Sequence, residues 1–393
     1  MRYLFSLIGA FLLAGSAVSA QSDIRLFQSG AEKFEALLAD MQQAQHHIHC
    51  EYFIFADDSI AHRMLDVMKA KAGEGVEVRL VVDGYYDVKR GYNYAGRLDQ
   101  LRREGIDIHI YKPYVFPYVH RVLRDHRKIV VVDGRIGYTG GFNVADYNIK
   151  GKDMYGGYID THVRLEGPEV EDLQFLFAEH LEKSGGKPFA GDAYYPYTAV
   201  LSEGLDDRQS SVRIVERGRS SRQKKAEMRR EVIAFIDSAE VSLHIQSPYL
   251  MPTPGVRRAL RRALSRGVKI EVLFSQVGDT PLFDTGNVFY SHQLQKRGAR
   301  VWLYQGAFQH SKVLTADGRR SLVGSANLDY RALRWNEEVA AVIDDREATL
   351  WLDSAFAGSV RQSVGMTPQY YYNLPLKTRI KGAMTDFFLS WCL

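Results

Sequence analysis

The sequence predicts an α/β protein of two homologous lobes, each with a mixed, largely parallel sheet flanked by helices and packed about a pseudo-two-fold axis. Three observations lead to this fold class. The chain has 393 residues, more than one ordinary domain of about 150 residues. Apolar, β-branched stretches alternate with segments of helical periodicity. The same order of elements then recurs in the second half of the chain.

The N-terminal segment predicts a leader rather than part of the fold. Arg2 precedes an apolar stretch of about 13 residues, which is shorter than the roughly 20 needed to span a bilayer. Small residues follow, ending at Ala20. We therefore expect a signal peptide over residues 1–20 and an exported, membrane-associated protein of the periplasm or cell envelope. An uncleaved anchor is the alternative.

The repeated elements follow one another in the same order in both halves. Each half begins with an apolar, aromatic strand that ends at a tyrosine, followed by a helix, a second strand after Gly-Val, and a further helix, glycine and strand. In the first half these are the strand ending at Tyr52, helix 60–72, strand 75–83 and the pair 98–111; in the second half they are the strand ending at Tyr249, helix 256–264, strand 267–275 and the pair 291–304.

The junction between the halves is expected where glycine and proline interrupt the pattern, near residues 185–210. We predict a first lobe over residues 21–200 and a second over residues 201–393 with a divergent C-terminal tail. The basic segment 217–230 is interpreted as a solvated helix face or connector, with contact to anionic lipid or nucleic acid as the alternative. A formal charge of +4 and only two cysteines exclude a polybasic protein, a disulfide framework and a cysteine-based zinc site.

One motif occurs twice at identical spacing. HRKIVVVDGRIGYTGGFN begins at His126, and HSKVLTADGRRSLVGSAN begins at His310. In both, a lysine follows the histidine by two positions, and an aspartate, a glycine and an asparagine come later at matching intervals. Two copies in equivalent places of a repeat are not a coincidence of composition.

The spacing assigns different tasks to the motif residues. Residues two apart on a strand point to the same face, so each His-Lys pair shares a surface. Asp-Gly between two apolar strands is typical of a hairpin turn, so we interpret the aspartates as turn-forming. Each asparagine returns beside the pair on the next strand. The pairs are His126 with Lys128 and His310 with Lys312, the aspartates are Asp133 and Asp317, and the asparagines are Asn143 and Asn327.

These residue types suit the transfer of a phosphoryl-linked group. Lysines and asparagines stabilise the phosphate oxygens, one imidazole attacks phosphorus, and the other protonates the leaving alkoxide. A nucleophilic imidazole needs a carboxylate on its other nitrogen. Asp160 and Glu338 are the candidates, and either could serve a histidine of either half. We expect no metal and no cofactor.

The paired motifs and their surroundings resemble the phospholipase D superfamily and are most similar to bacterial cardiolipin synthases. The resemblance is carried by DHRKIVVVDGRIGYTGGFNVADYN (125–148), DTHVRLEGPEV (160–170), SPYLMP (247–252) and VGSANLDYRAL (323–333). It implies the phospholipase D-like fold, with His126 as nucleophile, His310 as general acid and base, and the lysines and asparagines on the phosphate. Glu338 matches the family's supporting carboxylate, and Asp160 is the weaker match. The chain departs from the family in Gly141, which replaces a serine, in its single short apolar N-terminal segment and in its C-terminus.

The resemblance implies a phosphatidyltransferase or phospholipase that acts on phospholipids through a covalent phosphohistidine. We expect a phospholipid substrate and an anionic membrane surface as partners, no nucleic acid, and leave the oligomeric state open. The aromatic segment 111–118 is interpreted as an entrance for acyl chains or as a packed loop. A secreted, metal-independent endonuclease of the same superfamily and a catalytically silent lipid-binding module are the alternatives.

Overall fold

The computed structural model describes residues 22–84, 94–111, 123–151, 156–198, 211–218, 222–278 and 281–391. The expected leader and residues 112–118 of the aromatic segment lie outside the described residues, as do residues 199–210. The division of the lobes at residue 200 therefore stays a prediction. Within the described part, every helix is too short or too polar to cross a bilayer.

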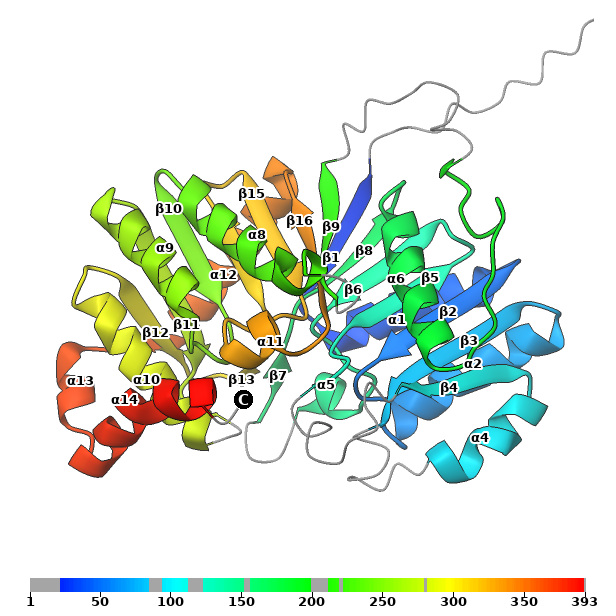
Figure 1. Cartoon of the computed structure of the whole chain (residues 1–393), viewed down its shortest axis with the longest axis horizontal. Helices are drawn as coiled ribbons and strands as arrows, with labels where there is room; N and C mark the ends of the chain where they lie inside the picture. Colours follow the sequence, from blue (N-terminus) through cyan, green and yellow to red (C-terminus); the bar gives the residue numbers. More distant parts are fainter. Residues whose placement is uncertain are drawn as a thin grey trace, which may run out of the picture.

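Two large mixed sheets flanked by helices form the body of the molecule (Figure 1). The first has seven strands in the order β1-β8-β6-β5-β2-β3-β4, and the second has eight in the order β17-β12-β11-β10-β14-β15-β16-β9. The first comprises β1 (Asp23–Phe27), β2 (His47–Tyr52), β3 (Glu77–Asp83), β4 (Ile106–Tyr111), β5 (Lys128–Val132), β6 (Ile136–Gly140) and β8 (His162–Glu166). The second comprises β9 (Val212–Arg217), β10 (Ser242–Gln246), β11 (Lys269–Ser275), β12 (Arg300–Tyr304), β14 (Val313–Ala316), β15 (Arg320–Gly324), β16 (Glu338–Ile343) and β17 (Ser363–Gly365).

The predicted α/β class with two mixed sheets is confirmed, but the expectation that the sheets are largely parallel is wrong. Only β2-β3-β4 and β10-β11-β12 run parallel, as the helical crossovers require. The motif strands form the antiparallel hairpins β5-β6 and β14-β15, and the following strands β8 and β16 also join antiparallel. Most strand pairs in each sheet are therefore antiparallel.

Helices cover both sheets (Figure 1). The main ones are α1 (Gly30–Gln43), α2 (Ser59–Gly73), α4 (Tyr94–Arg103), α6 (Val170–Lys183), α8 (Lys224–Ser238), α9 (Pro254–Ser265), α10 (Pro281–Gln295), α12 (Arg346–Arg361) and α14 (Leu376–Trp391). Shorter helices are α5 (Tyr147–Lys150), α11 (Tyr330–Arg334) and α13 (Pro368–Tyr372). The predicted helices 60–72 and 256–264 fall within α2 and α9. Asp58 caps α2 by accepting a hydrogen bond from the Ala61 N–H group.

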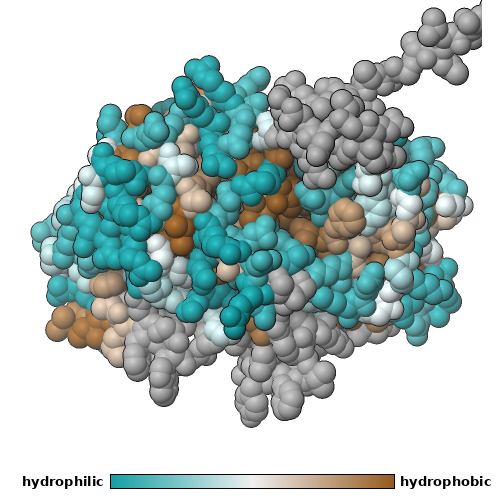
Figure 2. All heavy atoms as spheres, turned by 45° about the horizontal axis from the view of Figure 1, so that its top comes forward, coloured by the Kyte–Doolittle hydropathy of each residue, from teal (hydrophilic) through white to brown (hydrophobic). Residues whose placement is uncertain are grey.

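A hydrophobic cluster between the two sheets joins the lobes. Besides one core inside each lobe, a third cluster contains side chains from both sheets, among them Ile129 and Val163 of the first and Val323 and Val339 of the second. Hydrophobic residues come into view where the two halves meet in Figure 2, within an otherwise largely hydrophilic face. Burying one such side chain contributes roughly 1.5–3 kcal/mol, so apolar contact holds the lobes together.

A two-stranded sheet bridges the lobes beside this core. Strand β7 (Tyr158–Ile159) of the first lobe pairs in parallel with β13 (Phe308–Gln309) of the second. The residues that follow these strands are Asp160 and His310. The pairing therefore brings a carboxylate of one lobe beside a histidine of the other.

Candidate active site

The motif aspartates lie at the turns of the two hairpins. Asp133 and Asp317 have left-handed backbones, with φ of 53° and 56°, a conformation that aspartate tolerates better than most residues. The Asp133 carboxylate accepts hydrogen bonds from the N–H groups of residues 45–47 at 2.8–2.9 Å, and that of Asp317 accepts from residues 240–242 over the same range. Each aspartate thus ties its hairpin to the start of the neighbouring strand, β2 or β10.

His126 is held in the first lobe's motif by contacts to the second lobe. Its N–H group donates to the Glu337 carbonyl at 2.9 Å, and its Nδ1 lies 2.9 Å from Oε2 of the buried Glu338. The Phe53 ring packs edge-on against the imidazole, with ring centres 4.9 Å apart. Burial lowers the pKa of His126 below its ordinary value, although Glu338 opposes the shift. The imidazole is therefore neutral near pH 7, with Nδ1–H directed to the carboxylate and the lone pair on Nε2.

His310 of the second lobe is held by contacts to the first lobe. Its N–H group donates to the Ile159 carbonyl at 2.7 Å, and its Nδ1 lies 2.6 Å from Oδ2 of the buried Asp160 in the first lobe. Lys312 Nζ lies 3.3 Å from the same carboxylate oxygen. Although burial alone would raise the pKa of Asp160, the charges of Lys312 and His310 hold it below the ordinary aspartate value. Asp160 is therefore a carboxylate at neutral pH.

The two histidines exchange their supporting carboxylates between lobes. The first-lobe His126 pairs with the second-lobe Glu338, and the second-lobe His310 pairs with the first-lobe Asp160. The structure thus brings together both candidate carboxylates with both histidines. It resolves the alternatives that the sequence left open in favour of crossed pairing.

The lysines lie beneath the histidines of their own motifs. Lys128 is fully buried, and its Nζ donates to the His126 carbonyl at 2.7 Å. Burial lowers the pKa of Lys128 to about 7; the charge of Lys312 adds to the shift and Glu338 opposes it. The contacts of His126 with Glu338 and of His310 with Asp160 place both motifs at one site. A bound phosphate anion would raise the pKa of Lys128 and favour its charged form.

The asparagines follow the ends of β6 and β15 and are buried. Asn143 Oδ1 accepts a hydrogen bond from the Ile54 N–H group at 3.2 Å, which leaves its amide as a donor. Asn327 Oδ1 has no hydrogen-bond partner among the described residues. A buried polar atom in that state is costly unless a ligand or water meets it.

The position that departs from the family pattern is accounted for by packing. In the second motif, the Ser325 hydroxyl donates to Glu338 Oε2 at 2.5 Å. In the first motif, a Cβ atom on Gly141 would lie only 1.9 Å from Asp160 Oδ1. Because aspartate is one methylene shorter than glutamate, its carboxylate stays close to the main chain and occupies the space of a side chain at position 141.

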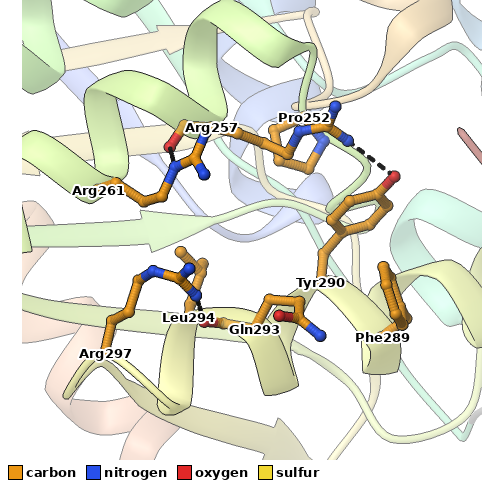
Figure 3. A pocket seen from close by; sticks show the side chains of 8 residues that line it. All are labelled: Pro252, Arg257, Arg261, Phe289, Tyr290, Gln293, Leu294 and Arg297. Atoms are coloured by element: carbon orange, nitrogen blue, oxygen red, sulfur yellow. Dashed lines mark hydrogen bonds between the residues drawn. The ribbon is translucent and has the colours of Figure 1, made fainter. Parts of the chain in front are cut away.

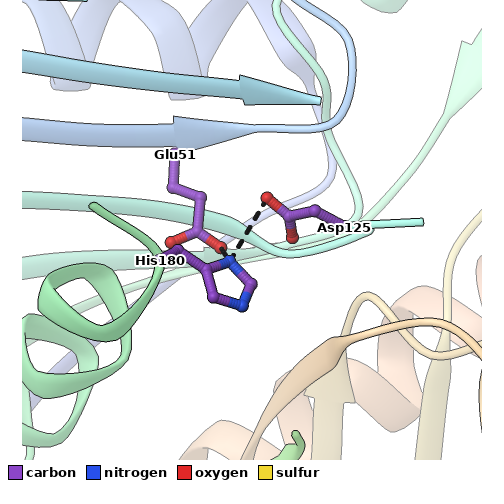
Figure 4. Close-up of side chains that lie close together, drawn as sticks. All are labelled: Glu51, Asp125 and His180. Atoms are coloured by element: carbon purple, nitrogen blue, oxygen red, sulfur yellow. Dashed lines mark ion pairs between the residues drawn. The ribbon is translucent and has the colours of Figure 1, made fainter. Parts of the chain in front are cut away.

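Beside the site lies a buried network of charges that the sequence did not reveal. His180 Nδ1 is 2.9 Å from Glu51 Oε1 and 3.5 Å from Asp125 Oδ2, and the three side chains converge from different elements (Figure 4). Their ligand atoms are close enough to surround a cation. Arg127, however, lies 3.1 Å from His180 Nε2 and pairs with Glu216 of the second lobe at 2.6 Å. The guanidinium already supplies the positive charge that a metal ion would bring.

This network reaches the backbone of His126 through Glu337. Tyr111 donates its hydroxyl to Glu337 Oε2 at 2.6 Å, and His180 Nε2 lies 3.4 Å from Oε1. The Glu337 carbonyl accepts from the His126 N–H group. The charges of its neighbours lower the pKa of Glu337 despite burial. The only sequence signal was the order Asp-His-Arg-Lys, which places opposite charges on either side of His126.

The basic segment 217–230 is partly structural. Arg217 is buried and donates to the carbonyls of Trp335 and Asn336 at 2.9 and 2.5 Å. Lys224 pairs with Glu216 at 2.6 Å. Arg217 therefore does not belong to the solvated face that we predicted, and Lys224 is paired with a carboxylate.

Comparison with known proteins finds relatives among the cardiolipin synthases. Residues 37–153 and 232–359 match the family model described as cardiolipin synthase, PLD-like domain. A cardiolipin synthase of Listeria monocytogenes serotype 4b (strain F2365) is 30% identical over 377 residues, covering 94% of this chain and 76% of the relative. A probable cardiolipin synthase of Bacillus subtilis (strain 168) is 31% identical over 374 residues, covering 94% and 72%.

A solved structure shares the fold at low sequence identity. The phosphatidylserine synthase of Haemophilus influenzae Rd KW20 superposes with a TM-score of 0.69 over 93% of both chains, at 14% identity. The likeness covers both lobes and their packing.

Proposed function

Since the chain belongs to the cardiolipin synthase family of phospholipase D-like proteins, we propose that it transfers phosphatidyl groups through a covalent phosphohistidine on His126. The observation that carries the proposal is the pairing of each motif histidine with a carboxylate of the opposite lobe. Two imidazoles oriented in this way, with two lysines beside them, form a site for one phosphodiester.

In the first step, Nε2 of His126 attacks phosphorus. A phosphorus–nitrogen bond forms, and the bond between phosphorus and the headgroup oxygen breaks. His310 gives its Nε2 proton to that oxygen, so the headgroup leaves as a neutral alcohol. Glu338 stabilises the positive charge that develops on the His126 ring, and Lys128 and Lys312 stabilise the phosphate oxygens.

In the second step, an acceptor hydroxyl attacks phosphorus from the side that the headgroup left. His310 takes the acceptor's proton, the phosphorus–nitrogen bond breaks, and neutral His126 is regenerated. If the acceptor is the hydroxyl of phosphatidylglycerol, the product is cardiolipin; if it is water, the product is phosphatidic acid. Asp160 keeps Nδ1 of His310 occupied, so that the same ring nitrogen serves as acid and then as base.

The proposed enzyme acts outside the cytoplasm after loss of residues 1–20. The family relationship supports a phospholipid substrate over the phosphodiester of a nucleic acid. We assign the phosphohistidine to His126 rather than to His310 because, in the family that this chain resembles, the histidine of the first motif is the nucleophile.

The test is a trapping experiment with a short-chain phosphatidyl ester of p-nitrophenol, whose leaving group needs no proton. In His310→Ala the first step should proceed while the second lacks its base, so mass spectrometry should find a phosphatidyl adduct on His126. His126→Ala should release no nitrophenol above background, a loss of about 10³-fold or more. Wild-type enzyme with phosphatidylglycerol should give cardiolipin.

A matched variant is His62→Ala, because His62 also pairs with an aspartate, Asp57, but is exposed on α2, outside both motifs. It should turn over like the wild type. An adduct on another residue, or none in His310→Ala while nitrophenol is released in a burst, would overturn the mechanism. Degradation of plasmid DNA without lipid turnover would show that the substrate is a nucleic acid rather than a phospholipid.

A further inference from the structure

Helix α14 carries an apolar stripe that no part of the described chain covers. Leu376, Ile380 and Met384 are 63%, 48% and 41% exposed, and Tyr372 of α13 is 48% exposed. Single exposed apolar residues are ordinary on a protein surface, but a contiguous row marks an interaction surface. At about 100° per residue, positions four apart lie on one face of a helix, so the three α14 side chains form one stripe.

The opposite face of α14 is packed on α10. Gly382 and Thr385 are buried, and a Cβ atom on Gly382 would lie 2.6 Å from the Thr285 carbonyl and 2.9 Å from Phe289 Cβ. The helix is therefore fixed to the lobe through its small residues. The apolar stripe on the outward face of α14 is therefore not part of the core of the lobe.

Cations flank the stripe. Lys377 and Lys381 are exposed on one side, at roughly 100° and 140° from Leu376, and Arg379 lies about 60° away on the other side. An apolar stripe with lysine and arginine along its edges is typical of a helix that lies in the interface of an anionic bilayer. Charge thus selects an anionic surface as the partner.

A basic pocket lies between α9 and α10. It has a volume of about 330 Å³, with Arg261 and Arg297 at one end, Phe289 and Tyr290 at the other, and Arg257 beside Tyr290 (Figure 3). Arg261 and Arg297 form no ion pair with a carboxylate among the described residues; their hydrogen bonds go to the carbonyls of Arg257 and Gln293. Guanidinium groups at one end of a pocket and aromatic rings at the other are suited to a phosphate with an adjoining apolar chain.

Helix α10 contacts α14 and also lines the pocket. Phe289 lines the pocket and also touches α14 at Gly382. Hydrophobic side chains gather at the left end of the molecule in Figure 2, the end at which Figure 1 places α13 and α14. Pro252, the last residue of the motif SPYLMP, lines the same pocket, and Met251 donates its N–H group to the carbonyl of Leu328, the residue after Asn327. The pocket is thus connected to the second motif by one short segment.

We propose that α14, with the pocket between α9 and α10, docks the second lobe on an anionic phospholipid bilayer. The stripe enters the boundary between headgroups and acyl chains, and the arginines bind the phosphate of one lipid that is not the reacting one. The inference rests on the proposed function, since it supplies the surface from which the lipid substrate is drawn. A second copy of this chain is the rival occupant of the stripe.

The test compares vesicle binding with turnover of a soluble substrate. Leu376→Glu combined with Ile380→Glu should reduce co-sedimentation with phosphatidylglycerol vesicles about tenfold or more, because each exposed side chain loses its burial in the bilayer. Arg261→Glu combined with Arg297→Glu should weaken binding to these vesicles and leave the weak binding to phosphatidylcholine vesicles unchanged. Both variants should hydrolyse the short-chain p-nitrophenyl ester within about twofold of the wild type, because neither touches the motif residues.

Leu350→Glu on α12 is the matched control, since Leu350 is 43% exposed on another face. It should bind vesicles like the wild type. Unchanged vesicle binding in Leu376→Glu/Ile380→Glu overturns the proposal, as does equal loss in the control. Loss of a dimer in sedimentation velocity, with vesicle binding intact, assigns the stripe to a second copy. Failure of the wild type to turn over any lipid contradicts the proposed function while leaving the binding result standing.

Discussion

The two halves of the site differ by a matched pair of residues. Serine faces glutamate in the second motif, and glycine faces aspartate in the first. The longer Glu338 leaves room for the Ser325 hydroxyl that binds it. The shorter Asp160 fills that room itself, so Gly141 is the counterpart of the shorter carboxylate rather than a loss of the motif.

This pairing predicts that restoring the family residue impairs the enzyme. Gly141→Ser should displace Asp160 from His310 and lower kcat of the phosphatidyl transfer by about 10–100-fold, because the imidazole loses its orienting carboxylate. The double variant Gly141→Ser/Asp160→Glu rebuilds the serine–glutamate pair of the second motif, and it should recover part of the lost kcat. Steady-state kinetics with the short-chain substrate measure both.

Ser325→Gly is the reference for this experiment. It removes one hydrogen bond to Glu338 without creating a clash, and we expect a decrease of kcat of less than about tenfold. An equal effect of Gly141→Ser and Ser325→Gly would contradict the steric argument.

Several of these residues could be predicted from the sequence because the motif is repeated. The spacing places His126 with Lys128 and His310 with Lys312. Asp160 and Glu338 were candidates because a nucleophilic imidazole needs a carboxylate and because they match the family that the chain resembles. The crossed pairing could not be predicted, because it depends on how the lobes dock. Arg127, His180 and Glu337 were missed for the same reason: their partners are distant in sequence, and no motif spacing marks them.

At the scale of elements, α1 contains a charge that the fold buries. Lys33 is fully buried, and its Nζ donates to the Tyr52 hydroxyl at 3.2 Å and lies 3.9 Å from the centre of the Phe34 ring. Burial lowers the pKa of Lys33 to about 7. In the unfolded chain the lysine pKa is about 10.4.

Lys33→Met should therefore stabilise the protein at low pH. Between about pH 7 and pH 10.4 the unfolded chain binds more protons than the folded one, so the stability of the wild type rises with pH over this window. Below pH 7 the full penalty of burying the ammonium is present. We expect the variant to gain roughly 1–3 kcal/mol at pH 6 and much less at pH 9, as measured by denaturant unfolding at both values.

Lys225→Met serves as the control, since Lys225 is exposed on α8. It should change the free energy of unfolding equally little at both pH values. A Lys33→Met variant that is destabilised at pH 6 would mean that the hydrogen bond to Tyr52 outweighs the cost of desolvation.

The elements themselves show where periodicity is informative. Helices α2 and α9 and the strands beside them have clear patterns and were predicted. The direction of the strands was not, because an apolar run looks alike in a parallel and an antiparallel sheet. Asp133 and Asp317 already indicated two antiparallel hairpins, but the sheets contain further antiparallel strands, such as β9 and β17, whose neighbours are remote in sequence.

At the scale of the whole molecule, the lobes are joined by a charge network as well as by an apolar core. Arg127 is fully buried and is surrounded by carboxylates of both lobes, which raise its pKa although burial alone would lower it. Removal of one partner from such a network leaves the others buried and uncompensated.

Arg127→Met should consequently destabilise the protein by about 3–5 kcal/mol, since Glu216 and its neighbours lose their counter-charge. The midpoint of urea unfolding measures the effect. Arg262→Met is the comparison, because Arg262 pairs with Asp237 at the surface, with half of its side chain exposed, and it should shift the midpoint little. Similar midpoints for the two variants would show that the network contributes little to docking of the lobes.

The crossed carboxylates also set a time at which activity begins. His126 and Glu338 are separated by 212 positions, so at about 5–20 residues per second a ribosome needs roughly 10–40 s to make the second after the first. During that interval the nascent chain carries His126 without its carboxylate, its partner histidine or the lysine opposite. We therefore expect a truncated or stalled product to be inert toward the lipids of the cell that makes it, and the reaction to become available only after Glu338 has been synthesised and the lobes have docked.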